Sequence, residues 1–217
     1  MPNQTVLKTI LDTGVVAILR VQTQQNLQPT VEALFAGGVC AIEITLTSPG
    51  ALSTLQALAH HSPTGCAIGV GSVLDAESAR AAILAGAQFV VTPTLNLPAI
   101  ELCKRYSVPV MPGAYTPTEI ITAWQAGADI VKLFPCDIGG PAYLKAVKAP
   151  LPQVLLAAVG GVSVENASAY IRAGAVALGV GSSLVNEALI QQADWDAMQQ
   201  RARNLVAAVQ AARGSSV

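Results

Sequence analysis

Residues 121–135 read ITAWQAGADIVKLFP, which is a helix-forming run followed by an Ala-Gly pair and then by a β-branched run. The same order recurs at residues 32–46 (EALFAGGVCAIEITL), 79–93 (ARAAILAGAQFVVTP) and 167–181 (ASAYIRAGAVALGVG). Glycine commonly ends a helix in the left-handed conformation. We therefore expect each unit to be a helix that leads into a strand, with helix ends at Gly37, Gly86, Gly127 and Gly174.

Four further apolar runs alternate with these units: VVAILR (15–20), CAIGVG (66–71), VPVMPG (108–113) and VLLAAVGG (154–161). Together they predict eight strands about 20–26 residues apart, and these begin near residues 15, 40, 66, 88, 108, 129, 154 and 176. Eight consecutive strand–helix units indicate an α/β fold of the (β/α)8 or TIM-barrel type. The alternative, a doubly wound open sheet, usually has a glycine-rich dinucleotide turn after its first strand, and none follows VVAILR.

The two ends of the chain complete this prediction. A short helix is expected near residues 4–13 and a C-terminal helix from Asp194. No linker or low-complexity stretch interrupts the pattern. We therefore expect residues 1–217 to form one barrel domain.

The composition limits the possible partners. Hydrophobic residues make up 52% of the 217 residues and charged residues 12%, which excludes disorder and predicts a large core. The net charge of −1 gives no reason to expect nucleic acid or a membrane surface as a partner. No run reaches the roughly 18 apolar residues of a membrane helix. The N-terminus also lacks the features of a signal peptide, so we expect a cytoplasmic protein.

Cysteine and histidine give no sign of a metal site. The two histidines, His60 and His61, are neighbours in a polar stretch that we interpret as a solvated loop. The four cysteines are far apart and are interpreted as buried reduced thiols: Cys40, Cys66, Cys103 and Cys136. A metal-dependent reaction therefore has little support.

Charged residues within the predicted strands point to a site at one end of the barrel. Side chains alternate sides along a strand, so Glu43 in AIEITLT and Lys132 in DIVKLF should point into the barrel while their apolar neighbours meet the helices. Arg20 ends the first strand. Asp129 opens its strand and belongs to the opposite, amino end. Barrel enzymes carry their chemistry at the carboxyl ends of the strands, where the other three charges converge.

An inward lysine among apolar groups has its ammonium form disfavoured, which lowers its pKa, and a nearby arginine acts in the same direction. The neutral amine can then attack a carbonyl carbon and form a Schiff base. Glu43, if charged, opposes that shift, but it is the only inward carboxylate that could move protons. Two plainer alternatives remain: a half-solvated Lys132 at the end of its strand, and a Glu43 that only forms a salt bridge.

Glycine-rich loops follow the last two strands. VLLAAVGGV ends in Gly160 and Gly161, and ALGVGSSL ends in Gly181 and Ser182. In barrel enzymes these two loops often bind a phosphate group through backbone N–H groups. We expect an anion site here.

With these residues in place, the chain resembles the 2-keto-3-deoxy-6-phosphogluconate and 4-hydroxy-2-oxoglutarate aldolases, which are class I aldolases and include a branch that acts on the 6-phosphogalactonate epimer. The resemblance runs from about Val15 to Leu184. Its blocks occur in order: VAILR, IEITLTSP, GVGSVL, VTPTLN, MPGAYTPTE, VKLFP, AVGGV and GVGSSL. It implies a lyase of carbohydrate metabolism that needs no cofactor, takes a small 2-keto acid phosphate and forms a homotrimer.

The resemblance also implies roles for single residues. Lys132 would be the Schiff-base lysine and Glu43 the acid/base residue. Ser72 stands where the family usually has a threonine at the pyruvate site, and Pro93 and Phe134 would form apolar walls. The phosphate end would comprise Gly160, Gly161, Gly181 and Ser182.

The chain departs from part of the family at one substrate-binding position. Some members have an arginine where Thr47 stands, and it binds the substrate carboxylate. Other members have Thr or Asn there and an arginine at the end of the first strand, as Arg20 is here. We assign carboxylate binding to Arg20.

The implied reaction cleaves 2-keto-3-deoxy-6-phosphogluconate to pyruvate and glyceraldehyde 3-phosphate, and 4-hydroxy-2-oxoglutarate to pyruvate and glyoxylate. Which of these acids, or the galactonate epimer, is the physiological substrate stays open, as does a side activity on oxaloacetate. One rival is a phosphate-binding barrel isomerase or epimerase that uses Glu43 as base and Lys132 as a charge. Another is a non-catalytic sugar-phosphate sensor, which would have no use for Glu43.

Overall fold

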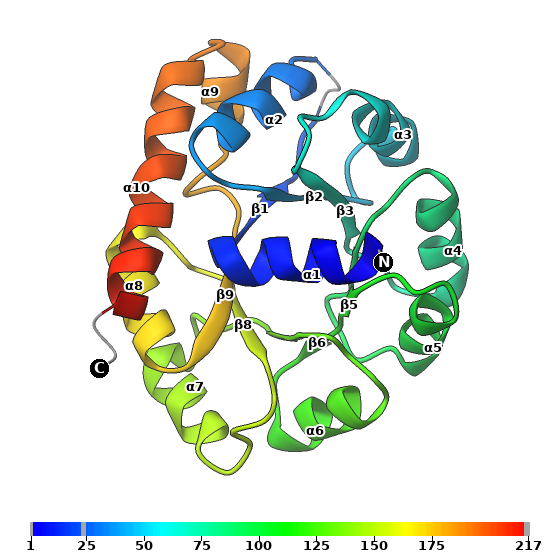
Figure 1. Cartoon of the computed structure of the whole chain (residues 1–217), viewed down its shortest axis with the longest axis vertical. Coiled ribbons are helices and arrows are strands. Elements are labelled where there is room, and N and C mark those ends of the chain that lie inside the picture. Colours follow the sequence, from blue (N-terminus) through cyan, green and yellow to red (C-terminus); the bar gives the residue numbers. More distant parts are fainter. Residues whose placement is uncertain (1, 23–24, 215–217) are drawn as a thin grey trace.

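The computed structural model describes residues 2–22 and 25–214, and its centre is a ring of parallel strands (Figure 1). The strand order in the sheet is β5-β4-β3-β2-β1-β9-β8-β7-β6. The strands are β1 (Val15–Leu19), β2 (Ala41–Thr45), β3 (Ala67–Gly71), β4 (Val90–Val91), β5 (Val110–Met111), β6 (Gly113–Ala114), β7 (Val131–Leu133), β8 (Leu156–Val159) and β9 (Ala175–Val180).

The predicted barrel is confirmed, with one difference in its fifth strand. That strand is divided into β5, which pairs with β4, and β6, which pairs with β7. Pro112 lies between the two halves and has no N–H to donate to a neighbouring strand. Its carbonyl still accepts a hydrogen bond from the Lys132 N–H at 2.9 Å. The two edge segments of the sheet order are therefore consecutive in the chain, and the ring closes through them.

Helices surround the ring, except for the first helix, which lies across its centre (Figure 1). They are α1 (Pro2–Thr13), α2 (Leu27–Ala36), α3 (Ala51–His61), α4 (Ala76–Leu84), α5 (Leu97–Arg105), α6 (Pro117–Gln125), α7 (Gly140–Lys148), α8 (Val164–Arg172), α9 (Glu187–Gln191) and α10 (Trp195–Gly214). Within the described ranges, none of these helices is long and apolar enough to cross a membrane. Both terminal helices occur where the sequence predicts them.

The two faces of each strand enter two different cores. Ile42, Ile44, Val131 and Leu133 belong to the large core between strands and helices. The alternate positions point inward. Ile130, two residues before Lys132, packs in the centre of the ring. The inward orientation predicted for Glu43 and Lys132 follows from this alternation.

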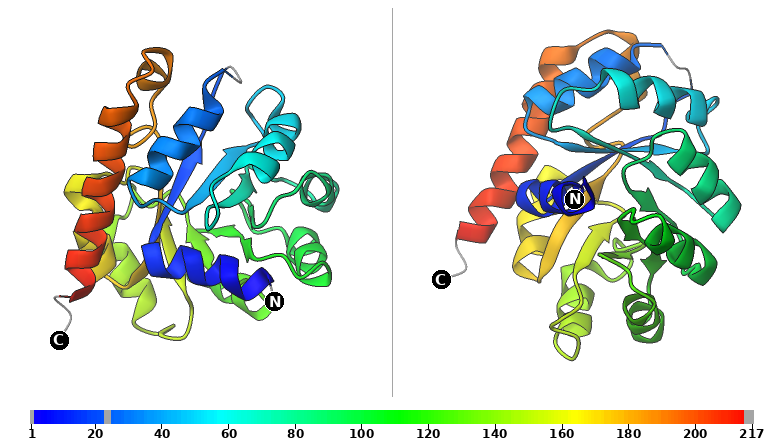
Figure 2. Two further views of the ribbon diagram at one scale, coloured as in Figure 1. Left: turned by 45° about the horizontal axis from the view of Figure 1, so that its top comes forward. Right: turned by 45° about the vertical axis from the view of Figure 1, so that its right-hand side comes forward.

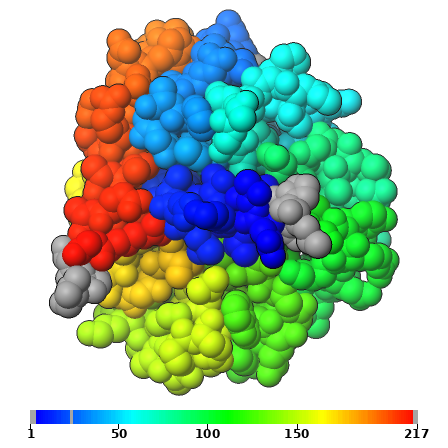
Figure 3. All heavy atoms as spheres, viewed as in Figure 1, coloured from blue at the N-terminus to red at the C-terminus, as the bar shows by residue number. Residues whose placement is uncertain are grey.

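Helix α1 covers the amino end of the barrel. It lies across that end in all three ribbon views, and in Figure 3 its residues cover the centre of the face (Figures 1 and 2). Val6 and Ile10 pack on the interior residues Val16, Ala41 and Phe89. The barrel is thus a packed core at this end, and only its carboxyl end can admit a substrate.

Glycine follows the end of all four repeated helices, as predicted. Gly86, Gly127 and Gly174 are left-handed, with φ values of +102°, +98° and +109°. At the first unit Gly37 caps α2 as expected, but its φ is −83°, and the left-handed residue is the next one, Gly38, at φ +94°. Gly37 instead allows close helix packing, since a Cβ there would lie 2.5 Å from the Cβ of Ala202 in α10.

Two predictions for histidine and cysteine also need correction. His60 and His61 are exposed, but they form the last turn of α3 rather than a loop. Cys40 is only partly buried, whereas the other three cysteines are buried thiols as expected.

Ile10→Ala should destabilise the fold strongly, because Ile10 is fully buried between α1 and the barrel interior. Removing such a side chain costs about 2–5 kcal/mol of unfolding free energy. The control is Lys8→Ala, which removes only an exposed ion pair with Asp12 and should cost less than about 1 kcal/mol. Urea unfolding of both variants measures the difference. Equal, small losses would show that α1 does not contribute to the core.

Candidate active site

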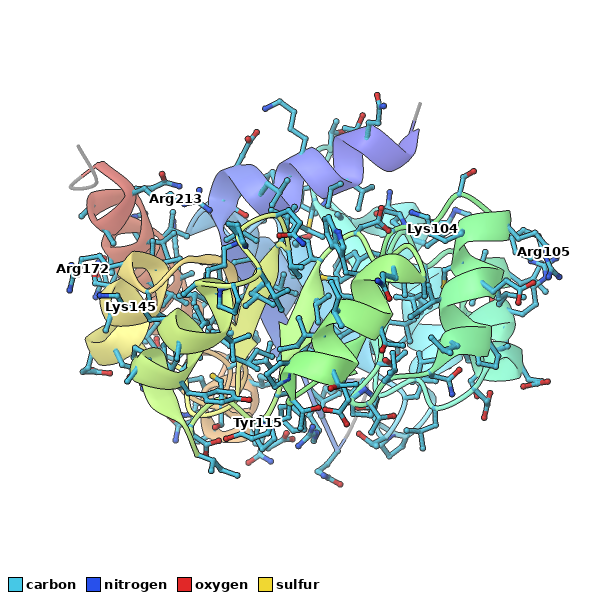
Figure 4. The ribbon with its side chains drawn as sticks, turned by 90° about the horizontal axis from the view of Figure 1, so that it is seen from below. Lys104, Arg105, Tyr115, Lys145, Arg172 and Arg213 are labelled. Carbon is cyan, nitrogen blue, oxygen red and sulfur yellow. The ribbon has the colours of Figure 1, made fainter. Side chains whose placement is uncertain are left out.

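The carboxyl end of the barrel lies opposite α1. In Figure 4, Tyr115, which directly follows β6, lies at the end of the barrel far from α1, whereas Lys104 lies near α1. Lys104 forms an ion pair with Asp129 at 2.9 Å, and Asp129 also accepts from the Val110 N–H at 2.9 Å. Asp129 therefore stabilises the amino end, as predicted, and belongs to no site at the other end.

Lys132 is central in β7 and buried, with a relative exposure of 6%. Its neighbours in the adjacent strands are Gly113 and Ala157, whose small size leaves room for its side chain. The amine lies 4.8 Å from the centroid of the Phe134 ring, in a cation–π position. The alternative of a half-solvated lysine is excluded by this burial.

Glu43 lies in the middle of β2 and is 3% exposed. Gly71 of the next strand makes room for it, because a Cβ at Gly71 would overlap the Glu43 carboxylate. None of the ion pairs among the described residues joins Glu43 to Lys132 or Arg20. The alternative of a simple salt bridge for Glu43 is therefore not what the structure shows.

Burial shifts the pKa values of both groups toward their neutral forms. Burial lowers the pKa of Lys132, the charge of Glu43 opposes this, and the charge of Arg20 adds to it. Burial raises the pKa of Glu43, and the positive charges of Lys132 and Arg20 both oppose that rise. The three groups therefore interact electrostatically at the carboxyl end, as the sequence predicts. A lysine in this environment has an increased fraction of neutral, nucleophilic amine.

Arg20 follows β1 directly and its side chain is exposed. The loop that begins there is held by β2 and the turn after it, since the Val21 N–H donates to Ser48 Oγ at 3.1 Å. Ser48 also contacts the Thr45 hydroxyl at 3.2 Å, and Thr47 donates to that same hydroxyl at 3.1 Å. The Thr47 hydroxyl thus forms a hydrogen bond within its own turn. The charge of Arg20 acts on both buried groups, Glu43 and Lys132.

A pocket of about 480 Å³ opens at this end of the barrel. It brings together six of the residues predicted from the sequence: Arg20, Phe134, Gly160, Gly161, Gly181 and Ser182. The Phe134 ring contacts the Lys132 amine and so joins this pocket to the lysine. Lys132 and Glu43 themselves do not line the pocket, and neither do Thr47, Ser72 and Pro93.

Those remaining predicted residues lie on the neighbouring strand ends. Ser72 follows β3 directly and has the unusual φ of +59°. The Pro93 backbone lies so close to Gly113 that a Cβ at Gly113 would overlap it. Because Gly113 pairs with Lys132 in the sheet, Pro93 is near the lysine strand.

The glycine loops present free backbone donors to the pocket. Among the described residues, the N–H groups of Gly161, Val162, Ser182 and Ser183 have no hydrogen-bond acceptor. Gly160 and Gly161 have φ values of +107° and +64°, which only glycine adopts readily. Such a set of N–H groups without acceptors around one pocket suits a phosphate. Within residues 2–22 and 25–214, no group of three or more His, Cys, Asp or Glu residues could hold a metal ion.

Sequence reasoning missed two contributors to this site. The first is Gly71, which the sequence shows only as part of the GVGSVL block. That block does not indicate that the Glu43 carboxylate lies against Gly71. Val162 was not singled out either, although the pattern of two glycines before it is the signal that its N–H could face an anion.

A closed barrel with a buried lysine and a buried glutamate at its carboxyl end defines the class of this protein, a (β/α)8-barrel enzyme. The family model for KDPG and KHG aldolase matches residues 6–201. The 2-dehydro-3-deoxy-phosphogluconate aldolase of Pseudomonas aeruginosa is 33% identical over 190 residues, which cover 87% of this chain and 86% of that one. The 2-dehydro-3-deoxy-6-phosphogalactonate aldolase of Escherichia coli is 39% identical, with coverage of 78% and 83%.

A solved structure agrees with these relatives. The KDPG aldolase of Legionella pneumophila, with pyruvate captured as a covalent carbinolamine intermediate, superposes with a TM-score of 0.85 and is 26% identical, over 94% of this chain and 98% of that one. The chain belongs to the KDPG and KHG aldolase family and is an aldehyde-lyase.

The pH dependence of the lysine should respond in opposite directions to two substitutions. The second-order rate constant for trapping of pyruvate by borohydride, measured well below saturation with pyruvate, should follow the neutral amine of Lys132 in the free enzyme, with a midpoint below 10.5. Arg20→Gln removes a charge that lowers the pKa, so the midpoint should move to higher pH. Glu43→Gln removes a charge that raises the pKa, so the midpoint should move to lower pH. Shifts in the same direction for both variants would contradict this electrostatic arrangement.

Proposed function

We propose that this enzyme is a class I aldolase that cleaves 2-keto-3-deoxy-6-phosphogluconate to pyruvate and glyceraldehyde 3-phosphate through a Schiff base on Lys132. The observation that carries the proposal is the lysine amine buried at the carboxyl end of a barrel of this family, beside a buried glutamate. The reaction is reversible. By the same steps the enzyme would also cleave 4-hydroxy-2-oxoglutarate to pyruvate and glyoxylate.

The reaction begins when the neutral amine of Lys132 attacks the C2 carbonyl carbon and water leaves, which gives a protonated imine. Glu43, directly or through a water, takes the proton of the C4 hydroxyl. The C3–C4 bond then breaks, its electron pair moves toward the imine, and the aldehyde leaves. The enamine is protonated at C3, and water releases pyruvate and the free lysine. The iminium is the electron sink, so this chemistry requires no metal or organic cofactor.

The other residues bind the two ends of the substrate. Arg20 pairs with the C1 carboxylate. It is an arginine in the pocket wall, and it stands at the end of the first strand, where some family members also have an arginine. Ser72 donates a hydroxyl at the pyruvate end, with Thr47 beside it. Pro93 and Phe134 form apolar walls around the lysine. The phosphate binds at the loops that contain Gly160, Gly161, Gly181 and Ser182.

A second candidate substrate is the 6-phosphogalactonate epimer. Thr47 and Arg20 match the family members that lack an arginine in the second strand loop, and the Escherichia coli galactonate relative is similar to this chain. The two epimers differ at one hydroxyl, and both would use the same lysine, glutamate and phosphate loops. Comparison of kcat/KM on the two acids decides between them.

Trapping with pyruvate and borohydride tests the proposal. The wild type should gain one adduct on the peptide that contains Lys132, and Lys132→Arg should gain none, since a guanidinium is not a nucleophile at ordinary pH. Lys145 and Lys148 of α7 serve as internal controls, because Lys145 is exposed and the half-buried Lys148 amine donates to the Pro152 and Val154 carbonyls. An adduct on either of them, or cleavage without any adduct, would favour an isomerase or another mechanism.

Glu43→Gln should slow cleavage by about 10²–10⁴-fold, the usual value of a positioned proton shuttle. It should still trap pyruvate on Lys132, since the amine is retained. Cleavage within twofold of wild type would assign Glu43 a structural role only.

Gly181→Val should selectively impair the phosphorylated substrate. A Cβ at Gly181 meets no protein atom within 4 Å, so the added side chain would occupy the mouth of the pocket without disturbing the fold. Cleavage of the six-carbon phosphorylated acid should therefore fall much more than cleavage of 4-hydroxy-2-oxoglutarate, which has no phosphate. Equal losses on both substrates would exclude a phosphate site at these loops.

We further propose that the enzyme is a homotrimer and is located in the cytoplasm. Leu74, which follows β3, is 62% exposed, and Leu97 at the start of α5 is 46% exposed. The side chain of Asn96 donates to the Leu74 carbonyl at 2.7 Å, which holds the loop of Leu74 against the start of α5, where Leu97 lies. We propose that these two exposed leucines belong to the subunit interface.

Light scattering should give three times the chain mass of 22.2 kDa for the wild type. Leu74→Lys with Leu97→Lys should dissociate the trimer, whereas Leu84→Lys, at the far end of α4, should not. A monomeric wild type would contradict the proposed assembly.

A further inference from the structure

Three consecutive carbonyl groups of the loop after β8 accept hydrogen bonds from side chains of three different elements. Cys136 Sγ, in the loop after β7, donates to the Gly160 carbonyl at 3.1 Å. Asn166 Nδ2 of α8 donates to the Gly161 carbonyl at 2.9 Å. Ser183 Oγ, in the loop after β9, donates to the Val162 carbonyl at 2.7 Å.

These contacts fix the direction of the N–H groups in the same loop. In a trans peptide unit the C=O of one residue and the N–H of the next point to opposite sides. With the Gly160 carbonyl turned to Cys136, the Gly161 N–H points away from the thiol. With the Gly161 carbonyl turned to Asn166, the Val162 N–H points away from that amide. Both N–H groups lack a protein acceptor among the described residues, and both residues line the 480 Å³ pocket.

Cys136 is itself held firmly. It is 1% exposed, its N–H donates to the Val159 carbonyl at 2.8 Å, and its carbonyl accepts from the Tyr170 hydroxyl at 3.2 Å. Burial also raises the pKa of the thiol, so it stays protonated and able to donate. Since Cys136 lies only four residues after Lys132, it connects the lysine strand with the loop of Gly160 and Gly161.

Ser183 has a different role from its neighbour Ser182. The Ser183 hydroxyl is engaged with the Val162 carbonyl, whereas the Ser182 hydroxyl has no partner among the described residues and lines the pocket. Ser182 is thus available to a ligand, and Ser183 acts on the loop.

We propose that Cys136 and Asn166 are positioning residues that turn the N–H groups of Gly161 and Val162 toward the phosphate of the substrate. Ser183 anchors the next carbonyl of the same loop, and the three side chains together set the preference for phosphorylated substrates. The proposal rests on the proposed aldolase function for its substrate. In this proposal the loop contacts the phosphate only through its backbone, and side chains from three other segments hold the loop in place.

The test uses Cys136→Ala, Cys136→Ser and Ser183→Ala, with Cys103→Ala as control. Cys103 is another fully buried cysteine, but it lies in α5 and contacts none of these loops. Asn166 is left intact because it also accepts from the Ser163 N–H at 2.9 Å and so begins α8. For each variant, kcat and KM are measured on 2-keto-3-deoxy-6-phosphogluconate and on 4-hydroxy-2-oxoglutarate, and the dissociation constant of inorganic phosphate is measured by calorimetry.

Cys136→Ala and Ser183→Ala should each lower the ratio of kcat/KM on the phosphorylated to the unphosphorylated substrate by about three- to tenfold, the effect of one neutral hydrogen bond. The dissociation constant of phosphate should rise by a similar factor. Cys136→Ser keeps a donor and should restore most of the ratio, and Cys103→Ala should leave it unchanged.

An unchanged ratio in both alanine variants, or an equal fall in Cys103→Ala, would overturn the proposal, because the contacts would then serve only packing. This test can be distinguished from the test of the aldolase proposal. If the wild type did not trap pyruvate on Lys132, the aldolase proposal would fail, and weaker phosphate binding by the two alanine variants would still decide the role of the three side chains.

Discussion

The burial of one ammonium group at the mouth of the barrel is the constraint on which the rest of the site depends. A buried lysine without a direct ion pair is unfavourable as a cation, and the chain lowers the pKa of Lys132 rather than pairing it. The apolar interior below it, closed by α1, keeps water away from the amino end. Gly113 and Ala157 beside Lys132 provide the space that its long side chain needs. The same packing that fills the barrel therefore increases the neutral fraction of the Lys132 amine.

The site has two ends of different character. At one end two buried groups act through side chains, and each shifts the pKa of the other. At the other end the loops after β8 and β9 offer backbone N–H groups, and side chains of neighbouring segments hold the carbonyls of the loop after β8. Cys136 links the two ends, because the loop that leaves the Lys132 strand also holds the Gly160 carbonyl. In the proposed reaction, binding energy gained at the phosphate would help to place the carbonyl carbon near the amine.

Much of this could be predicted from the sequence, because the rules involved are local. Alternation along a strand correctly placed Glu43 and Lys132 inside the barrel, and the repeated helix–strand units gave the barrel. The split of the fifth strand at Pro112 and the packing role of Gly37 depend on which segments meet in space. The role of Gly71 could not be predicted for the same reason, since only the folded chain shows that Gly71 lies against the Glu43 carboxylate. Cys136 was expected to be a buried thiol, but no sequence pattern reveals its acceptor 24 residues away.

A titration of the lysine itself tests the account most directly. In protein labelled with [ε-13C]lysine, the resonance of Lys132 is assigned by its absence from Lys132→Arg, and its chemical shift is followed with pH. The account predicts a midpoint below the ordinary value of 10.5, moving further down in Glu43→Gln. A midpoint at or above 10.5 would contradict it, because the amine would then be protonated at neutral pH as fully as an exposed lysine, and burial would not explain its reactivity.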